Sequence, residues 1–217
     1  MIVAVICAGG PNPEIVDMTE FLQDDTVFIG ADRGALHLLQ QGITPHEAVG
    51  DFDSVTSEEY DQIAAAVHKV GRFRSEKNET DTELAVDRAL TYNPERVILT
   101  GVTGGRLDHM ESALHLLYRL QMQHREIAFS IRNKTNELSI LFPGVHECAR
   151  EDRFAYISFF PFGGDVLGLT LSGFKYETVD ARLETGMTKF TSNEPAAEVC
   201  TISFHQGICL MVRSSDS

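Results

Sequence analysis

The chain has 217 residues, 43% of them hydrophobic and 23% charged, a composition typical of a globular protein with one large or two smaller domains. Its formal net charge of −14 argues against nucleic acid or an anionic membrane surface as a partner, because both would repel an acidic protein. A nucleotide is still compatible with this charge, since a few basic side chains and a cation can neutralise its phosphates locally.

The cysteines indicate a reducing environment. No C-x-x-C pair and no histidine at zinc-ligand spacing accompany them, so neither a zinc site nor a disulfide framework is predicted. The first residues, MIVAVICAGG, lack the basic segment of a signal peptide, and no stretch reaches the roughly 20 apolar residues of a membrane span. We therefore expect a cytoplasmic protein. The cysteines are Cys7, Cys148, Cys200 and Cys209.

In the first part of the chain, predicted strands alternate with predicted helices. Residues 2–8 are a continuous apolar run rich in β-branched residues, which is typical of a buried strand, and residues 26–29 and 96–100 repeat the pattern. A further strand is expected to lead into GDFDS, after an apolar run that ends in Val49. This alternation predicts a mostly parallel sheet flanked by helices over residues 1–124.

Two helix starts carry a capping signal. Thr56 with Glu59, and Thr80 with Glu83, have the spacing of a capping box, in which each side chain binds the other residue's backbone N–H. The apolar residues after Thr56 recur at helical spacing as far as Val70, so this helix is predicted to include Val70.

The pattern changes after residue 125. Short segments of alternating apolar and polar residues follow one another, separated by turn residues, which predicts an antiparallel sandwich or barrel. The sequence thus predicts an α/β domain over residues 1–124 and an all-β domain over residues 125–217. The segments are AFSIR, ELSILF, FAYISFF, LTLSGF, VCTISF and ICLMV.

GDFDS, residues 50–54, is the most informative polar segment. In an extended backbone Asp51 and Asp53 would project to the same face, and Phe52 would point into the protein. Two converging carboxylates repel each other unless a cation lies between them, and hard oxygen ligands favour Mg²⁺, which often accompanies nucleotide phosphates. The alternative is an acidic turn that is merely solvated.

Other polar clusters also follow predicted strands, where ligands of open α/β sheets bind. They are Gly9 and Gly10, Asp32 and Arg33, GDFDS itself, and TGGRLDH at residues 103–109. EKNETD, at residues 76–81, opens the helix before the last of these strands. Five loops at one sheet edge indicate a binding site more strongly than any single loop does.

Each residue of TGGRLDH has a functional and a structural interpretation. Gly104 and Gly105 could let the backbone approach a phosphate or simply form a turn, and the segment does not match a Walker-type loop. Arg106 is suited to a phosphate oxygen. For Asp108 the helix macrodipole is favoured over a role as catalytic base, and for His109 a structural role is favoured over a catalytic one.

Two further residues are ambiguous. Asp81 is either an ordinary residue of a first helical turn or a third carboxylate beside Asp51 and Asp53. Lys77 is either exposed or, if its loop folds inward, bound to a phosphate.

The motifs together resemble those of the thiamine pyrophosphokinase family over nearly the whole chain. GDFDS and TGGRLDH are the more specific ones, and the order and spacing of all of them strengthen the resemblance. The matching segments are GADRGA at 30–35, GDFDS at 50–54, KNETDTE at 77–83, TGGRLDH at 103–109, LSGFKY at 171–176 and TSNE at 191–194.

The resemblance implies that residues 1–124 bind ATP and Mg²⁺, and that residues 125–217 help to bind thiamine. It implies a homodimer with thiamine at the subunit interface. It also implies the reaction, in which the thiamine hydroxyl attacks the β-phosphorus of ATP and yields thiamine diphosphate and AMP.

Site residues are carried over by position from this resemblance. Asp51, Asp53 and Asp81 would bind the metal and, with Asp32 and Arg106, form the catalytic set. Asp32 would lie near the reacting groups, and Ser192 and Asn193 would contact thiamine from the other subunit. Which carboxylate accepts the proton is left open. The ATP-binding set would be Lys77, Thr103, Gly104, Gly105, Arg106, Asp108 and His109.

Two departures from the family pattern keep alternatives open. Asn78 stands where such enzymes often have Asp, and the chain has no Trp to stack on thiamine. The first alternative is a Mg²⁺-dependent phosphohydrolase that uses water in place of an alcohol. The second is a non-catalytic protein that binds a nucleotide or thiamine, for which Asn78 is the only sequence hint.

Overall fold

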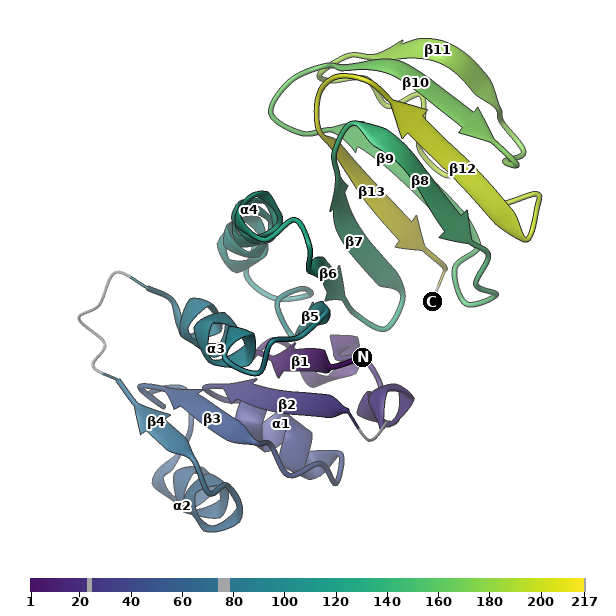
Figure 1. The fold of residues 1–217 in the computed structure, drawn as a ribbon. Helices are drawn as coiled ribbons and strands as arrows, with labels where there is room; N and C mark the ends of the chain where they lie inside the picture. The colour runs from purple at the N-terminus through teal and green to yellow at the C-terminus, as the bar shows by residue number, and fades with distance from the viewer. Residues whose placement is uncertain (23–24, 74–78, 217) are drawn as a thin grey trace. The chain divides into compact units, whose positions relative to one another are not determined.

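The structure, a computed structural model, describes residues 1–22, 25–73 and 79–216, and it divides into two compact units, residues 1–134 and 135–217. The first unit has a parallel sheet in the order β4-β3-β2-β1-β5-β6 (Figure 1). Cys7 at the end of β1 lies opposite Gly30 of β2 and Thr100 of β5, so these strands end at the same sheet edge. The strands are β1 (Val3–Cys7), β2 (Thr26–Ala31), β3 (Glu47–Gly50), β4 (Val70–Arg72), β5 (Arg96–Thr100) and β6 (Ala128–Arg132).

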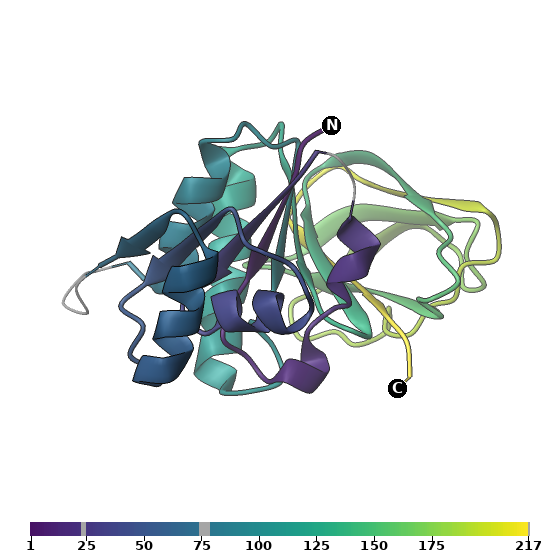
Figure 2. The ribbon, with the colours of Figure 1, turned by 90° about the horizontal axis from the view of Figure 1, so that it is seen from below.

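Helices cover both faces of this sheet (Figures 1 and 2). Apolar residues of α1 pack with β1 and β2 on one face, where α2 also lies, and α3 packs on β1, β2 and β3 from the other face, next to α4. Both predicted capping boxes are present, at Thr56 and at Thr80. The helices are α1 (Gly34–Gln40), α2 (Ser57–Ala66), α3 (Asp81–Leu90) and α4 (Leu107–Gln123), with short 3-10 helices η1 (Asn12–Glu14) and η2 (Met18–Phe21).

The predicted end of the second helix was wrong. α2 ends at Ala66, and Val70 begins β4, where it pairs with Ala48 of β3. A strand of three residues at a sheet edge is too short to show an alternating pattern, so Val70 fitted helical spacing by chance.

The predicted boundary at residues 124/125 differs from the observed division at 134/135. AFSIR, which was assigned to the second domain, forms β6 and pairs in parallel with β5, so that Ala128 lies opposite Arg96. Helix α4 is the crossover that makes this parallel pairing possible. A short strand carries no local signal of its partner's direction, which explains the difference.

The second unit is the predicted antiparallel sandwich. One sheet has the order β7-β13-β9 and the other β11-β10-β12-β8. Phe159 of the first sheet and Leu169 and Ile202 of the second belong to the same buried apolar cluster. The strands are β7 (Asn136–Leu141), β8 (Gly144–Ala149), β9 (Tyr156–Pro161), β10 (Val166–Ser172), β11 (Thr178–Leu183), β12 (Val199–Phe204) and β13 (Cys209–Ser214).

The order of the parallel strands creates a switch point. From β1 the chain proceeds to β2, β3 and β4 on one side of the sheet, and it later continues with β5 and β6 on the other side. The connections that leave β1 and β5 therefore lead to strands on opposite sides of this pair, and ligands of open α/β sheets bind at the carboxyl ends of the strands at such a point. In the part of the chain that the structure describes, no helix is long and apolar enough to cross a membrane.

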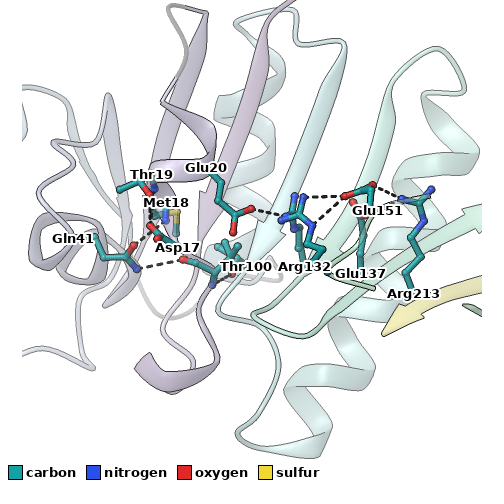
Figure 3. A network of polar contacts seen from close by, with 12 residues as sticks. Asp17, Met18, Thr19, Glu20, Gln41, Thr100, Arg132, Glu137, Glu151 and Arg213 are labelled. Atoms are coloured by element: carbon teal, nitrogen blue, oxygen red, sulfur yellow. Dashed lines mark hydrogen bonds and ion pairs between the residues drawn. The ribbon is translucent and has the colours of Figure 1, made fainter. Parts of the chain in front are cut away.

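Polar contacts hold the irregular segments of each unit (Figure 3). In the first unit, Gln41 accepts a hydrogen bond from the Met18 N–H at 2.9 Å, and the buried Arg132 pairs with Glu20 at 2.6 Å (Figure 3). In the second unit, Arg213 of β13 pairs with Glu151, which follows β8.

A buried carboxylate ties α3 to β3. Glu47 is only 3% exposed, and it accepts hydrogen bonds from Arg88 at 2.7 Å and from Tyr92 at 2.7 Å. Burial alone would raise the pKa of Glu47, but the bonds from Arg88, Tyr92 and Lys69 outweigh it and hold the pKa below its ordinary value. The stabilisation is therefore present above the ordinary glutamate pKa and is lost as the pH falls through the lowered one.

We predict that Arg88→Leu lowers the free energy of unfolding by about 2 kcal/mol at neutral pH, because Glu47 loses a charged hydrogen-bond partner. Urea unfolding would measure the change, and the loss should shrink in acid as Glu47 becomes protonated. Arg182→Leu, which removes a more exposed pair with Asp165, should cost less than about 1 kcal/mol. Equal costs for the two variants would contradict this role of Glu47.

Candidate functional site

A cavity of about 530 Å³ lies at the carboxyl ends of the parallel strands. Its walls come from the loops after β1, β2, β3 and β5, from the first turn of α3 and from one side of α4. The predicted convergence of these loops is thus confirmed for the described residues. Lys77 and Asn78 lie outside the described residues.

Carboxylates from two loops meet at this site. Oxygen atoms of Asp32, after β2, and of Asp51 and Asp53, after β3, all lie within 4.8 Å of one another. We call these three residues the carboxylate cluster. Asp81, the first residue of α3, lines the cavity together with Asp32 and Asp53. The structure therefore places Asp32, which was expected near the reacting groups, beside Asp51 and Asp53, whereas Asp81, expected as their third carboxylate, lines the same cavity outside this cluster.

The GDFDS segment reaches its conformation through a turn and not through an extended strand. Phe52 has a left-handed φ of 60°, and the Asp53 N–H donates to Asp51 Oδ1 at 3.1 Å. The Phe52 ring is nevertheless buried, and it packs edge-on against Tyr60 with 5.2 Å between ring centroids. The expected outcome, two aspartates together and an inward Phe52, is found, but the assumed backbone was wrong.

Asp32 is the most constrained member of the carboxylate cluster. Its backbone is left-handed, with a φ of 52°, and its N–H donates to the Val49 carbonyl at 2.8 Å. The Ser54 hydroxyl donates to Oδ2, whereas Oδ1 is buried and has no hydrogen-bond partner among the described residues. A buried carboxylate oxygen without a partner is costly, so it marks a position for a cation or a donor.

The electrostatic environment of Asp32 also favours a bound cation. Burial raises the pKa of Asp32, the hydrogen bond from the Ser54 hydroxyl lowers it, and the nearby Asp81 and Asp53 raise it further. Burial and the neighbouring carboxylates thus disfavour the charged form of Asp32 in the absence of a cation. Clustered carboxylate oxygens with one unsatisfied buried oxygen are a donor set that fits Mg²⁺.

The glycine-rich loop after β5 packs closely on the loop after β1. The Gly10 N–H donates to the Gly101 carbonyl at 2.7 Å, and a Cβ on Gly10 would lie 2.4 Å from that oxygen. Gly104 has a φ of 79° and packs on Glu14. Thr103 is buried, and its hydroxyl accepts a hydrogen bond from Asn133 at 2.9 Å. Turn formation and close backbone packing therefore both account for these glycines.

Arg106 precedes α4 and pairs with Asp108 in its first turn. The Arg106 Nε donates to Asp108 Oδ1 at 3.1 Å, and this bond lowers the pKa of Asp108. Both side chains are exposed, and Arg106 lines the cavity with Gly105 and His109. A ligand phosphate at this position would compete with Asp108 for the guanidinium.

In the second unit, TSNE and LSGFKY are joined by one buried side chain. Asn193 is 3% exposed, and its amide accepts from the Tyr176 N–H at 3.0 Å and donates to the Tyr176 carbonyl at 2.8 Å. The neighbouring Ser192 is exposed and left-handed, with a φ of 56°. Tyr176 itself is 61% exposed. The Asn193 amide therefore shapes this turn, and Ser192 and Tyr176 have the accessible side chains.

Sequence reasoning missed several residues that shape these sites. Ser54 and Tyr176 lie inside motifs that were singled out, but no role was assigned to them. Arg33 was noticed only for its position after a strand. Asn133 gave no local signal, because its contact with Thr103 joins residues 30 positions apart.

Comparisons with known proteins identify related sequences for both parts of the chain. Residues 18–129 match the family model described as thiamin pyrophosphokinase, catalytic domain, and residues 146–209 match thiamin pyrophosphokinase, vitamin B1 binding domain. Thiamine pyrophosphokinase of Bacillus subtilis (strain 168) is 39% identical over 211 residues, which cover 97% of this chain and 98% of that protein.

Solved structures show the same relationship. The crystal structure of thiamine pyrophosphokinase from Bacillus subtilis matches with a TM-score of 0.91 and 37% identity, over 100% of both chains. Thiamin pyrophosphokinase from Candida albicans matches with a TM-score of 0.82 over 99% of this chain and 89% of that one, and at 15% identity it supports the fold alone.

We predict that Asp53→Asn leaves the metal-free protein as stable as the wild type or slightly more stable, because it removes one of the mutually repelling charges. The same change should abolish most of the rise in melting temperature that Mg²⁺ alone produces. Differential scanning calorimetry with and without Mg²⁺ would measure both effects. Asp61→Asn, on the exposed face of α2, is the matched control and should respond to Mg²⁺ like the wild type.

Proposed function

The chain belongs to the thiamin pyrophosphokinase family, whose enzymes transfer a diphosphate group from ATP to thiamine, and we propose that the cavity of the first unit is where this transfer takes place. The observation that carries the proposal is the carboxylate cluster beside a glycine-rich loop, at the switch point of a parallel sheet. Ligands of such sheets bind at this position.

Mg²⁺ is proposed as the cofactor, held by Asp32, Asp51 and Asp53, with Asp81 beside them. The unsatisfied Oδ1 of Asp32 and the all-oxygen donor set support this assignment. When bound, the ion would neutralise phosphate charge and help to orient the reacting groups.

The chain's own residues would bind and orient the triphosphate. Arg106 can offer its guanidinium to a phosphate oxygen in exchange for Asp108, and His109 lies one helical turn further along the same wall. The backbone at Gly105 lines the cavity and carries no side chain, so a phosphate can approach it closely, whereas Gly104 packs on Glu14 and does not line the cavity. Positioning of this kind supplies much of the catalysis in phosphoryl-type transfers.

Thiamine binding is proposed for the turn that Asn193 holds together. Ser192 offers an exposed hydroxyl beside it, and Tyr176 offers an exposed aromatic ring in a chain without tryptophan. An aromatic face attracts a cation such as the thiazolium ring of thiamine. We therefore assign Tyr176 as the aromatic residue that contacts the vitamin.

The proposal also includes a cytoplasmic location and a homodimer. A reducing cytoplasm suits the four cysteines, which are buried and form no disulfide: Cys7, Cys148, Cys200 and Cys209. A homodimer is proposed from the family resemblance, and the exposed Val145 and Val199 on the paired strands β8 and β12 are compatible with a covered surface. Sedimentation equilibrium would test the dimer by giving the mass in solution.

The reaction itself is tested by its products. With ATP, Mg²⁺ and thiamine, the purified protein should form AMP and thiamine diphosphate in equal amounts. ADP as the only nucleotide product would refute diphosphate transfer. Phosphate release that continues without thiamine would favour the phosphohydrolase, and binding without turnover at any Mg²⁺ concentration would favour the non-catalytic protein.

We predict that Tyr176→Ala raises the KM for thiamine by about fivefold, because a ring–cation contact is worth about 1 kcal/mol, while the KM for ATP stays within about twofold. Tyr176→Phe keeps the ring and should behave nearly like the wild type. Val179→Ala shortens a still more exposed apolar side chain, on β11, and serves as the control. Steady-state kinetics would measure both constants, and equal increases in them would argue against this assignment.

A further inference from the structure

Arg33 connects the two loops that supply the carboxylate cluster. Its Nε and Nη2 atoms both donate to the Ser54 carbonyl, at 3.0 and 2.5 Å, and its Nη1 and Nη2 atoms donate to the Glu59 carboxylate at 3.2 and 3.0 Å. Arg33 follows Asp32 directly, whereas Ser54 follows Asp53. One guanidinium therefore ties the loop after β2 to the loop after β3. We call this set, Arg33 with the Ser54 carbonyl and the Glu59 carboxylate, the Arg33 clamp.

The far end of the Arg33 clamp is fixed to a helix. Glu59 is the third residue of α2, and its carboxylate accepts a hydrogen bond from the Thr56 N–H at 2.9 Å, as part of the capping box. The Glu59 N–H in turn donates to the Thr56 hydroxyl at 3.2 Å. The Arg33 clamp therefore joins the loop to the hydrogen-bonded first turn of α2.

The loop after β3 needs such an anchor. Phe52 and Asp32 both have left-handed backbones, which residues other than glycine adopt only where the surroundings hold them. The buried Phe52 ring fixes the middle of the loop, but the carboxylates of Asp51 and Asp53 repel each other and Asp32. Two contacts between the loops oppose this repulsion, the hydrogen bond from the Ser54 hydroxyl to Asp32 and the Arg33 clamp.

We propose that Arg33 is a positioning residue, which holds the loop of Asp51 and Asp53 against Asp32 so that the three carboxylates are together before a divalent cation binds. The proposal rests on the metal site proposed above. Partners that orient metal ligands typically change metal affinity by about 10- to 100-fold when they are removed.

The direction in which metal affinity changes when Arg33 is removed distinguishes a positioning role from a purely electrostatic one. Arg33 is a cation beside a cation site, so by charge alone its removal would strengthen metal binding. If it positions the loop, its removal weakens metal binding. Arg33→Met removes the charge and keeps most of the length, and Arg33→Lys keeps the charge but lacks the planar fork that reaches a carbonyl and a carboxylate together.

The experiment measures the affinity of the full chain for Mn²⁺ alone, by the EPR signal of free Mn²⁺, with no nucleotide or thiamine present. We expect about tenfold weaker binding for Arg33→Met and a smaller loss for Arg33→Lys. Arg182→Met, which removes a similar arginine fork on Asp165 in the second unit, should bind Mn²⁺ like the wild type. Circular dichroism should show that both Arg33 variants are folded at the temperature of the titration.

The Mn²⁺ titrations distinguish failure of the positioning role from failure of the metal site. Suppose that the wild type binds Mn²⁺ through Asp53 and that Arg33→Met binds it equally well or more tightly. This result would overturn the positioning role and leave the metal site standing. Wild-type protein that binds no Mn²⁺ through Asp53 would overturn the metal site and this inference with it. If Arg33 instead bound a substrate phosphate, Arg33→Met would raise the KM for ATP at saturating Mg²⁺ while the Mn²⁺ affinity stayed unchanged, which would also overturn the inference.

Discussion

Repulsion among the clustered aspartates is the constraint on which the rest of the site depends. Three carboxylates whose oxygens lie within 4.8 Å of one another, near a fourth at Asp81, are unfavourable in a folded protein without a compensating cation. The fold must therefore hold them in place by other means. It does so with the buried Phe52 ring, with the Ser54 hydroxyl on Asp32, and with the guanidinium of Arg33.

Left-handed backbone occurs at both proposed binding sites. Asp32 and Phe52 are left-handed at the carboxylate cluster, and Ser192 is left-handed in the turn proposed for thiamine. Each such residue costs of the order of 1 kcal/mol, so it persists only where packing and hydrogen bonds fix the surrounding chain. Here Asp32 is held by the Val49 carbonyl, and Ser192 donates its N–H to the Ser158 hydroxyl at 2.9 Å.

The features that could be predicted from the sequence are those with local causes. Apolar runs, capping boxes and turn residues identified most of the parallel sheet, the starts of α2 and α3, and the loops that line the cavity. Features that depend on contacts between residues far apart in the sequence could not be predicted in this way. The assignment of β6 to the first sheet needed its pairing with β5, the addition of Asp32 to the cluster needed a left-handed backbone, and the role of Asn193 needed its bonds to Tyr176.

The motif GDFDS can now be explained letter by letter. Gly50 has a φ of 154°, and a Cβ there would lie 3.2 Å from the Asp32 backbone, so the first position must be small for the two loops to meet. Asp51 and Asp53 supply charge, Phe52 supplies the anchor in the core, and the final serine binds Asp32 through its hydroxyl and Arg33 through its carbonyl. Only two of the five letters are therefore proposed ligands. The other three residues hold those ligands close to Asp32. An isolated Asp-x-Asp is therefore weak evidence for a metal site, and the complete motif is much stronger evidence.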